Sequence, residues 1–300
     1  MQSKSQAPSI TTGPITAQLM LFFFPILLGT FFQQLYNTVD TIIVGNFVGT
    51  NTALAAVGGA TGQLVNLFVG FFIGLSSGCG VIISQYYGAR DQNAVSKSVH
   101  TALAFSLLSG VVIMVLGLLL TDFSLRAMSL PEEIMPEATA YLRIFFLGMI
   151  PNLFYNMGAA VLRAIGDSKR PLYFLILSCL CNIVLDLIFV AYLRLGVSGA
   201  ALATILSQLA SAVMVLFVLL RTKSDVRLIP SQLRLELFWL KKMIYVGLPA
   251  GLQSTMYTVS NIIVQATINS FGTNTIAAVT AYGKMDVIFW MVINAFGIAI

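Results

Sequence analysis

Four polar side chains lie at helical spacing inside the first apolar stretch of this sequence. Gln33, Tyr36, Asn37 and Asp40 follow one another at i, i+3, i+4 and i+7, so on a helix they form one polar face that ends in a carboxylate. The residues around that face are mostly Phe, Leu, Ile and Val. Because an ionisable side chain is costly in such surroundings, Asp40 indicates a functional site that binds an ion or a proton.

Two further polar faces are predicted at a similar depth. One apolar stretch carries Asn182 and Asp186 at i and i+4, and the next carries Thr204 and Gln208 at the same spacing. Counting residues from the outer ends of these stretches places Asp40, Asp186 and Thr204 within roughly 7 to 12 Å of the same boundary. We therefore expect the three faces to meet in one site.

The expected pairing of Asp40 with Asp186 restricts what this site could bind. Two carboxylates in a poorly hydrated pocket do not both stay charged unless a cation joins them, because repulsion and desolvation both destabilise the charged pair. The cation is either H⁺ on one carboxyl group or Na⁺ held by the oxygens of Asp40, Asn182, Asp186 and Thr204, and either would be a coupling ion. The alternative is a structural role, in which amide and hydroxyl groups bond to the acids and fix helix packing.

The elements that must position these residues are apolar stretches long enough to cross a membrane. The chain of 300 residues is 58% hydrophobic and 9% charged, and its mean hydropathy is +0.91. Apolar runs of about 20 residues or more match a hydrocarbon core ~30 Å thick, so each predicts a transmembrane helix. The predicted spans are at about 15–44, 53–86, 95–120, 138–162, 171–193, 198–221, 242–269 and 279–300. The sequence therefore predicts an all-α polytopic membrane protein.

The distribution of charge between the spans predicts the orientation. Lys and Arg outnumber Asp and Glu by 16 to 11, and most basic residues fall in alternate loops, above all between Arg221 and Lys242. The positive-inside rule then places the N-terminus in the cytoplasm and the protein in the cell (cytoplasmic) membrane. Since topology accounts for the basic residues, no nucleic-acid partner is predicted.

A short repeat divides the chain into two units. The tetrapeptide GTNT occurs at 49–52 and again at 272–275, each time after an upstream proline, Pro25 or Pro249, and before Ala-Val. Six predicted spans separate equivalent points, so the copies have the same orientation, as in transporters built from parallel repeats. We expect residues 1–228 to form an N-terminal six-helix lobe with a cytoplasmic inter-lobe loop. Residues 229–300 would begin a C-terminal lobe, in a chain truncated after its eighth span.

Other polar residues inside the predicted spans are candidates for lining an aqueous cavity. They are Gln33 and Asn37 in the first span, Asn156 in the fourth, and Gln253, Tyr257 and Asn261 in the seventh. Ordinary hydrogen bonding between helices is the alternative role for these side chains. Pro25 removes a backbone hydrogen bond in mid-span and so predicts either a hinge or a static kink. Asp286 predicts either an interfacial ion pair with Lys284 or a contact with substrate.

Several segments of the sequence resemble the N-terminal lobe of bacterial MATE (multidrug and toxic compound extrusion) transporters. They read FFPILLGTFFQQLYNTVDTIIVG, SQYYGARD, LRAIGDSKRPLY, and CNIVLDLIFV followed by GVSGAALATILSQ. The resemblance implies a helical bundle of twelve spans in two six-helix lobes, of which about eight spans are present here. It also implies export of organic cations or other amphiphiles in exchange for Na⁺ or H⁺.

The resemblance also implies roles for particular residues. By position, it implies a coupling site formed by Asp40, Tyr36, Asn182, Asp186 and Thr204. The span-four asparagine of the family corresponds to Asn156. One branch of the family carries an acid in span seven, and this chain has none there.

These observations predict a secondary active transporter rather than an enzyme. We expect a monomeric antiporter that works by alternating access, with a small amphipathic or cationic substrate, the lipid bilayer as its surroundings and no cofactor besides the coupling ion. The alternative is a flippase for lipid-linked or other amphipathic substrates, which would favour a basic cavity, whereas Arg143 is the only Lys or Arg well inside a predicted span. An intramembrane aspartyl protease is more distant, because NTVD and NIVLD lack the Gly-x-Gly-Asp signature of those enzymes.

Overall fold

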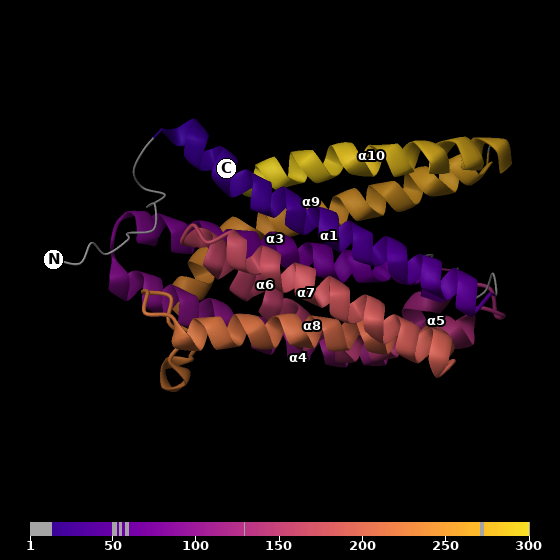
Figure 1. The fold of residues 1–300 in the computed structure, drawn as a ribbon, viewed down its shortest axis with the longest axis horizontal. Helices are drawn as coiled ribbons and strands as arrows, with labels where there is room; N and C mark the ends of the chain where they lie inside the picture. The colour runs from indigo at the N-terminus through magenta and orange to yellow at the C-terminus, as the bar shows by residue number, and fades with distance from the viewer. Residues whose placement is uncertain are drawn as a thin grey trace.

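The structure is a computed structural model that describes residues 14–49, 53, 56–57, 60–128, 130–270 and 273–299. All regular structure in these ranges is helical (Figure 1). In chain order the helices are α1 (Ile15–Phe47), α3 (Ala60–Gly88), α4 (Gln92–Ala127), α5 (Met135–Leu147), α6 (Met149–Ala164), α7 (Lys169–Asp186), the π-helical η1 (Leu187–Tyr192), α8 (Gly196–Arg221), the 3₁₀ turn η2 (Pro230–Gln232), α9 (Leu237–Ser270) and α10 (Thr273–Ala299). The all-α prediction is confirmed.

Most of the predicted spans are helices that could cross a bilayer. Among the described residues, five helices are long and apolar enough: α1, α3, α4, α7 together with η1, and α8. The bent pair α5 and α6 makes a sixth if it is one span. The last two predicted spans are helical as well, but α9 begins at Leu237 rather than near residue 242, and α10 at Thr273 rather than near 279.

The fourth predicted span is broken rather than straight. The helices α5 and α6 meet at Gly148 with an angle of 50° between them. Pro151 follows in the first turn of α6, and its ring nitrogen has no hydrogen to donate to the carbonyl of Leu147 four residues earlier. A Cβ on Gly148 would also collide with the side chain of Ile205 on α8. The break therefore lies where the backbone hydrogen bonds are interrupted and where only glycine fits against α8.

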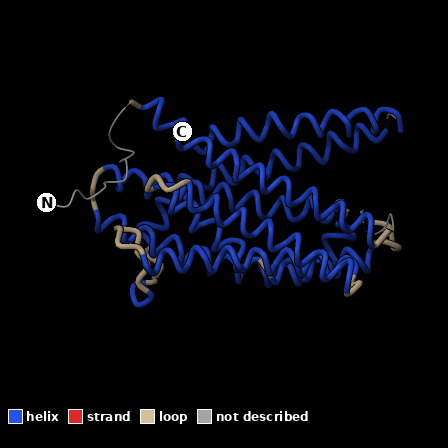
Figure 2. The backbone as a smooth tube through the Cα atoms, in the orientation of Figure 1, coloured by secondary structure: helices blue, strands red, loops and turns tan. Residues whose placement is uncertain are grey.

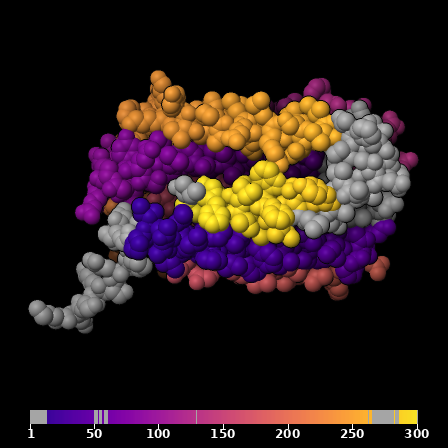
Figure 3. All heavy atoms as spheres, turned by 90° about the horizontal axis from the view of Figure 1, so that it is seen from above, coloured from indigo at the N-terminus to yellow at the C-terminus, as the bar shows by residue number. Residues whose placement is uncertain are grey.

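The helices run roughly along one direction, and the connecting loops gather at the two ends of the molecule (Figure 2). The closest helix pairs are α3 with α9, α4 with α6, and α7 with both α1 and α8. Two large apolar cores fill the interior; one includes Ile83, Leu103 and Leu219, and the other Val44, Leu142 and Met149. In the view of Figure 3, α10 (yellow) lies between α9 (orange) and α1 (indigo).

The loop between the two predicted lobes is packed against the rest of the molecule. Val226 and Leu228 are buried in the same core as Val99 on α4. The backbone N–H of Leu228 donates to the carbonyl of Leu219 at 2.9 Å, and the N–H of Ile229 donates to His100 Nε2 at 3.0 Å. The loop thus runs along the ends of α8 and α4. Of the repeated GTNT segments, residues 50–52 and 272 lie outside the described residues.

Candidate functional site

Three helices bring the predicted ion-site residues together. Asp40 comes from α1, Asn182 and Asp186 from α7, and Thr204 from α8, and all four are buried, with exposed fractions of 6%, 0%, 0% and 1%. The hydroxyl of Tyr36 on α1 lies 3.5 Å from Thr204 Oγ1 on α8. The carboxyl groups of Asp40 and Asp186 are neighbours in this cluster. The acids, the amide and the hydroxyls therefore form one cluster between α1, α7 and α8.

Most polar atoms of this cluster have no hydrogen-bond partner among the residues that the structure describes. Both oxygens of Asp186, Oδ1 of Asp40, and the amide oxygen and nitrogen of Asn182 are buried without one. Two charged carboxylates carry no proton, so neither can donate a hydrogen bond to the other. Because an unsatisfied buried polar group costs roughly 1–3 kcal/mol, and a charged one more, this arrangement is suited to hold a proton or a small hard cation.

The backbone of α7 changes at the acid itself. Asp186 is the last residue of α7, and the chain continues as the π-helical turn η1, in which the N–H of Leu193 donates to the carbonyl of Ile188 at 2.8 Å. Such π-helical turns frequently occur at functional sites. This turn is not apparent in the sequence, since its residues LIFVAY are as apolar as the helix before it.

The serines of α7 and α8 hold those two helices together. Ser178 Oγ donates to the carbonyl of Ser207 at 2.9 Å, and Ser211 Oγ donates to the carbonyl of Phe174 at 3.4 Å. On α8, Thr204 Oγ1 donates to the carbonyl of Ala200 at 3.0 Å. The relative position of Asp186 and Thr204 is therefore fixed by hydrogen bonds between side chains and backbone.

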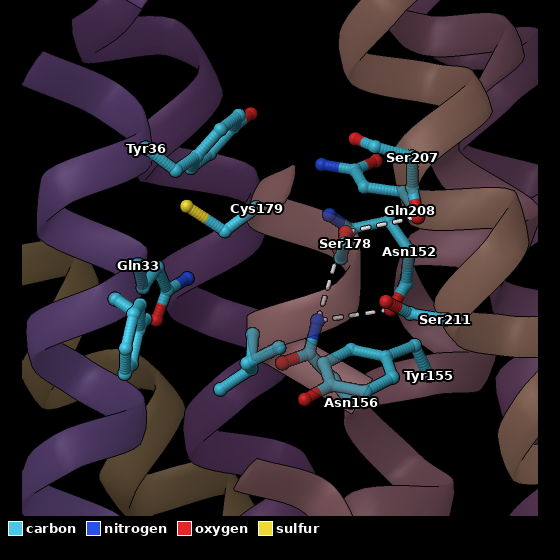
Figure 4. A pocket seen from close by; sticks show the side chains of 12 residues that line it. Gln33, Tyr36, Asn152, Tyr155, Asn156, Ser178, Cys179, Ser207, Gln208 and Ser211 are labelled. Carbon is cyan, nitrogen blue, oxygen red and sulfur yellow. Dashed lines mark hydrogen bonds between the residues drawn. The ribbon is translucent and has the colours of Figure 1, made fainter. Parts of the chain in front are cut away.

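A small polar cavity of about 60 Å³ adjoins the cluster. Gln33 and Tyr36 of α1 lie on one side of it, and Asn152 of α6 and Gln208 of α8 lie on the other (Figure 4). The amide of Asn156, a predicted cavity residue, donates to the carbonyl of Asn152 at 2.9 Å and also lines this space. A volume of this size holds a few water molecules but not a drug-sized compound, which needs about 300 Å³ or more.

A second cavity, a cleft of about 660 Å³, lies on another side of α1. Its lining includes Thr30 and Gln34 of α1, Gln253 and Tyr257 of α9, and Asp286 and Trp290 of α10. Gln253 and Tyr257 were predicted cavity residues, and this cleft is large enough for a drug-sized molecule.

Two predicted cavity residues lie elsewhere, and one face of α1 was missed. Asn37 and Asn261 are exposed, and neither lines the two cavities described above. Thr30 and Gln34 are spaced at i and i+4, so their shared face could have been found from the sequence in the same way as the face that ends at Asp40. Within the described residues no group of three or more His, Cys, Asp or Glu side chains could hold a metal ion.

Comparisons with known proteins point to one family. A family model described as MatE matches residues 25–188. The Probable multidrug resistance protein YpnP of Bacillus subtilis (strain 168) is 32% identical over 297 residues, which are 98% of this chain and 65% of that protein. The chain thus spans about two thirds of the length of this curated relative.

Two solved structures have the same fold. One is described as the outward-facing conformation of a multidrug resistance MATE family transporter of the MOP superfamily; it has a TM-score of 0.90 and 26% identity, over 99% of this chain and 66% of that one. The other is a MOP superfamily transporter from Pyrococcus furiosus, described as having a binding pocket of reverse polarity that suggests a different function. Its TM-score is also 0.90, with 26% identity over 99% of this chain and 66% of that one.

Proposed function

Because this chain belongs to the MatE family, we propose that the protein is a secondary active exporter that exchanges organic cations or related amphipathic compounds for H⁺ or Na⁺. The name of the Bacillus subtilis relative and the description of the outward-facing structure both support multidrug export. The two cavities around α1 support a division between an ion site and a substrate site.

The observation that carries this proposal is the buried pair of Asp40 and Asp186 with its unpaired oxygens. When the pair holds no cation, burial and repulsion between the two carboxylates destabilise this arrangement of α1, α7 and α8. A proton or Na⁺ removes that penalty, and a cation that binds one conformation more tightly than another shifts the population toward the first. Ion binding can thereby change which side of the membrane the protein opens to.

The helix α1 would connect the two sites. Asp40 and Tyr36 lie on its side toward α7 and α8, while Thr30 and Gln34 line the large cleft. A change in the position or shape of α1 on ion binding would alter the cleft directly. Pro25 lies within this helix and is the expected hinge, with a static kink as the alternative.

The orientation belongs to the same proposal. With the N-terminus in the cytoplasm, the Asp40–Asp186 pair lies in the outer half of the membrane, where ions from outside the cell reach it. The ion then moves inward as the substrate moves outward.

The test is efflux of the fluorescent cation ethidium from cells that express the complete reading frame. Wild type is compared with Asp186→Asn at matched membrane expression; the amide has the shape of the carboxyl group but cannot carry a negative charge. We expect efflux to fall at least tenfold in the variant and to remain in Asp122→Asn, a matched change at an exposed acid that is paired with Arg143. Omitting Na⁺ then identifies the coupling ion.

Two results would count against the proposal. If Asp186→Asn exports ethidium as fast as wild type, the pair of acids is not the coupling site. If wild type exports no organic cation, a flippase-like export of amphipathic substrates becomes the better interpretation. At present the described lining of the cleft favours cations, because it contains one acid and no Lys or Arg.

A further inference from the structure

The large cleft contains an acid that the ion site does not use. Asp286 lies on α10 and lines the cleft between α1, α9 and α10. Its Oδ2 accepts a hydrogen bond of 3.0 Å from Nε1 of Trp290, one turn further along the same helix. Asn294 lines the cleft another turn on, so the three side chains at i, i+4 and i+8 form a polar stripe along α10.

Two aromatic rings stand beside this carboxylate. The ring of Trp290 and the ring of Tyr257 on α9 are 5.7 Å apart between centroids, and they are 42% and 51% exposed, so both have free surface. The indole N–H fixes one carboxylate oxygen, Oδ2, by donating to it. A carboxylate next to accessible aromatic faces is the combination that attracts an organic cation, through charge and through the quadrupoles of the rings.

The surroundings strengthen that preference. The other described lining residues are neutral, among them Thr30, Gln34 and Gln253, so no basic side chain among them neutralises Asp286. At about 660 Å³, the cleft holds a molecule the size of a drug, whereas the cavity of about 60 Å³ beside the Asp40–Asp186 pair does not. The carboxylate that a bulky cation can reach is therefore Asp286.

We propose that Asp286, oriented by Trp290 and flanked by Tyr257, is the residue that selects cationic substrates in this cleft. This inference rests on the proposed export function and assigns its two charge-dependent tasks to different acids. The pair on the far side of α1 binds the coupling ion, and Asp286 binds the positive group of the substrate. Substrate and ion then occupy separate sites, so they can be bound at the same time and influence each other through α1 instead of competing for one carboxylate.

Equilibrium binding to the purified protein, produced from the complete reading frame, tests this assignment. The probes are the tetraphenylphosphonium cation and triphenylphosphine oxide, which offers similar phenyl rings without a charge. We expect Asp286→Asn to raise the Kd for tetraphenylphosphonium about tenfold or more and to leave the Kd for triphenylphosphine oxide within about twofold. Trp290→Phe, which keeps a ring but loses the N–H, should raise the Kd for the cation by a smaller factor.

Two control variants separate this site from the ion site and from general effects. Asp186→Asn should still bind tetraphenylphosphonium, with a change in Kd smaller than that of Asp286→Asn, because its carboxyl group lies outside the cleft and acts on it only through α1. Asp122→Asn, at an exposed acid paired with Arg143, should leave binding unchanged. Circular dichroism and the elution volume in size-exclusion chromatography establish that each variant is folded.

The outcomes distinguish this inference from the export proposal. If Asp286→Asn binds the cation as tightly as wild type, if it weakens both probes equally, or if wild type does not bind the cation, the assignment of Asp286 is wrong. If Asp186→Asn abolishes binding of the cation, substrate and ion share one site, and the separation is wrong. If binding depends on Asp286 but cells export no organic cation, the assignment of Asp286 is supported and the export proposal is wrong.

Discussion

At the scale of single residues, the proposed ion site combines burial with unsatisfied hydrogen-bonding groups. Asn182 is fully buried, and neither its amide oxygen nor its amide nitrogen has a hydrogen-bond partner in the described part of the chain. A residue whose task was to fix helix packing would have its hydrogen bonds satisfied, as Ser178 has by donating to the carbonyl of Ser207. The contrast between these two residues of the same helix is the argument for function at Asn182.

This contrast gives a prediction for stability and activity together. Asn182→Leu removes an unsatisfied buried amide, so we expect the free energy of unfolding to stay level or rise by about 1 kcal/mol while ion-driven efflux is lost. Ser178→Ala removes a satisfied bond and should lower stability by roughly 1 kcal/mol while efflux continues. Thermal unfolding in detergent and ethidium efflux measure the two properties. A large loss of stability in Asn182→Leu would assign this residue a structural role.

At the scale of elements, His100 joins α4 to the loop that precedes α9. Its Nδ1 lies 2.7 Å from the carbonyl oxygen of Ser96, which can only accept, and its Nε2 accepts from the N–H of Ile229 at 3.0 Å. These two bonds require the neutral imidazole with its hydrogen on Nδ1. The imidazole thus holds the loop in place against the end of α4.

We expect His100→Ala to release this loop. The substitution leaves the N–H of Ile229 without its partner and opens a void in place of the buried imidazole, at a cost of roughly 2–3 kcal/mol. Trypsin should therefore cleave after Lys223 and Arg227 several times faster than in wild type, as followed by mass spectrometry. The control is Ser96→Ala, which keeps the backbone carbonyl that His100 contacts. Equal cleavage rates in His100→Ala and wild type would show that the loop is held by its apolar residues alone.

At the scale of the whole molecule, the two predicted units meet along a seam between α3 and α9. Gly70, Gly74 and Gly78 repeat every four residues on α3; Gly74 faces Gly251 and Gly78 faces Gly247 on α9, while Gly70 faces Ser254. A Cβ on Gly74 would lie 2.5 Å from the backbone nitrogen of Gly251, and a Cβ on Gly251 would lie 2.8 Å from the carbonyl oxygen of Phe71. The two backbones therefore touch with no side chain between them, as in membrane helix pairs built on small residues.

This seam predicts a strong effect from one added methyl group. Gly74→Ala should force α3 and α9 apart and lower the free energy of unfolding by roughly 1–3 kcal/mol, because backbone atoms cannot move aside as a flexible side chain can. Gly88→Ala on the same helix is the matched control, since a Cβ there would meet no atom within 4 Å. Thermal unfolding of the purified variants measures the difference. Equal midpoints of thermal unfolding for the two variants would mean that α3 and α9 can move apart without a loss of stability.

The sequence by itself determined the features that depend on neighbouring residues along the chain. Apolar runs longer than about 20 residues predicted the helices, since a bilayer requires that length, and polar residues at helical spacing placed Asp40 and Asp186 on polar helix faces. The break at Gly148 and the π-helical turn after Asp186 were not predicted, because an apolar run has much the same composition whether its helix is straight, broken or locally π-helical.

Only the tertiary structure decided which faces meet and how much space lies between them. Helical spacing does not tell which neighbour a face packs against, so the cluster of Asp40, Asp186 and Thr204 was an expectation until α1, α7 and α8 were seen side by side. For the same reason the sequence did not predict the face of α1 that carries Thr30 and Gln34. It also did not predict that one cavity measures about 60 Å³ and the other about 660 Å³. Cavity volume depends on the packing of side chains from helices far apart in sequence, and for that reason the place of Asp286 beside the large cleft came from the fold.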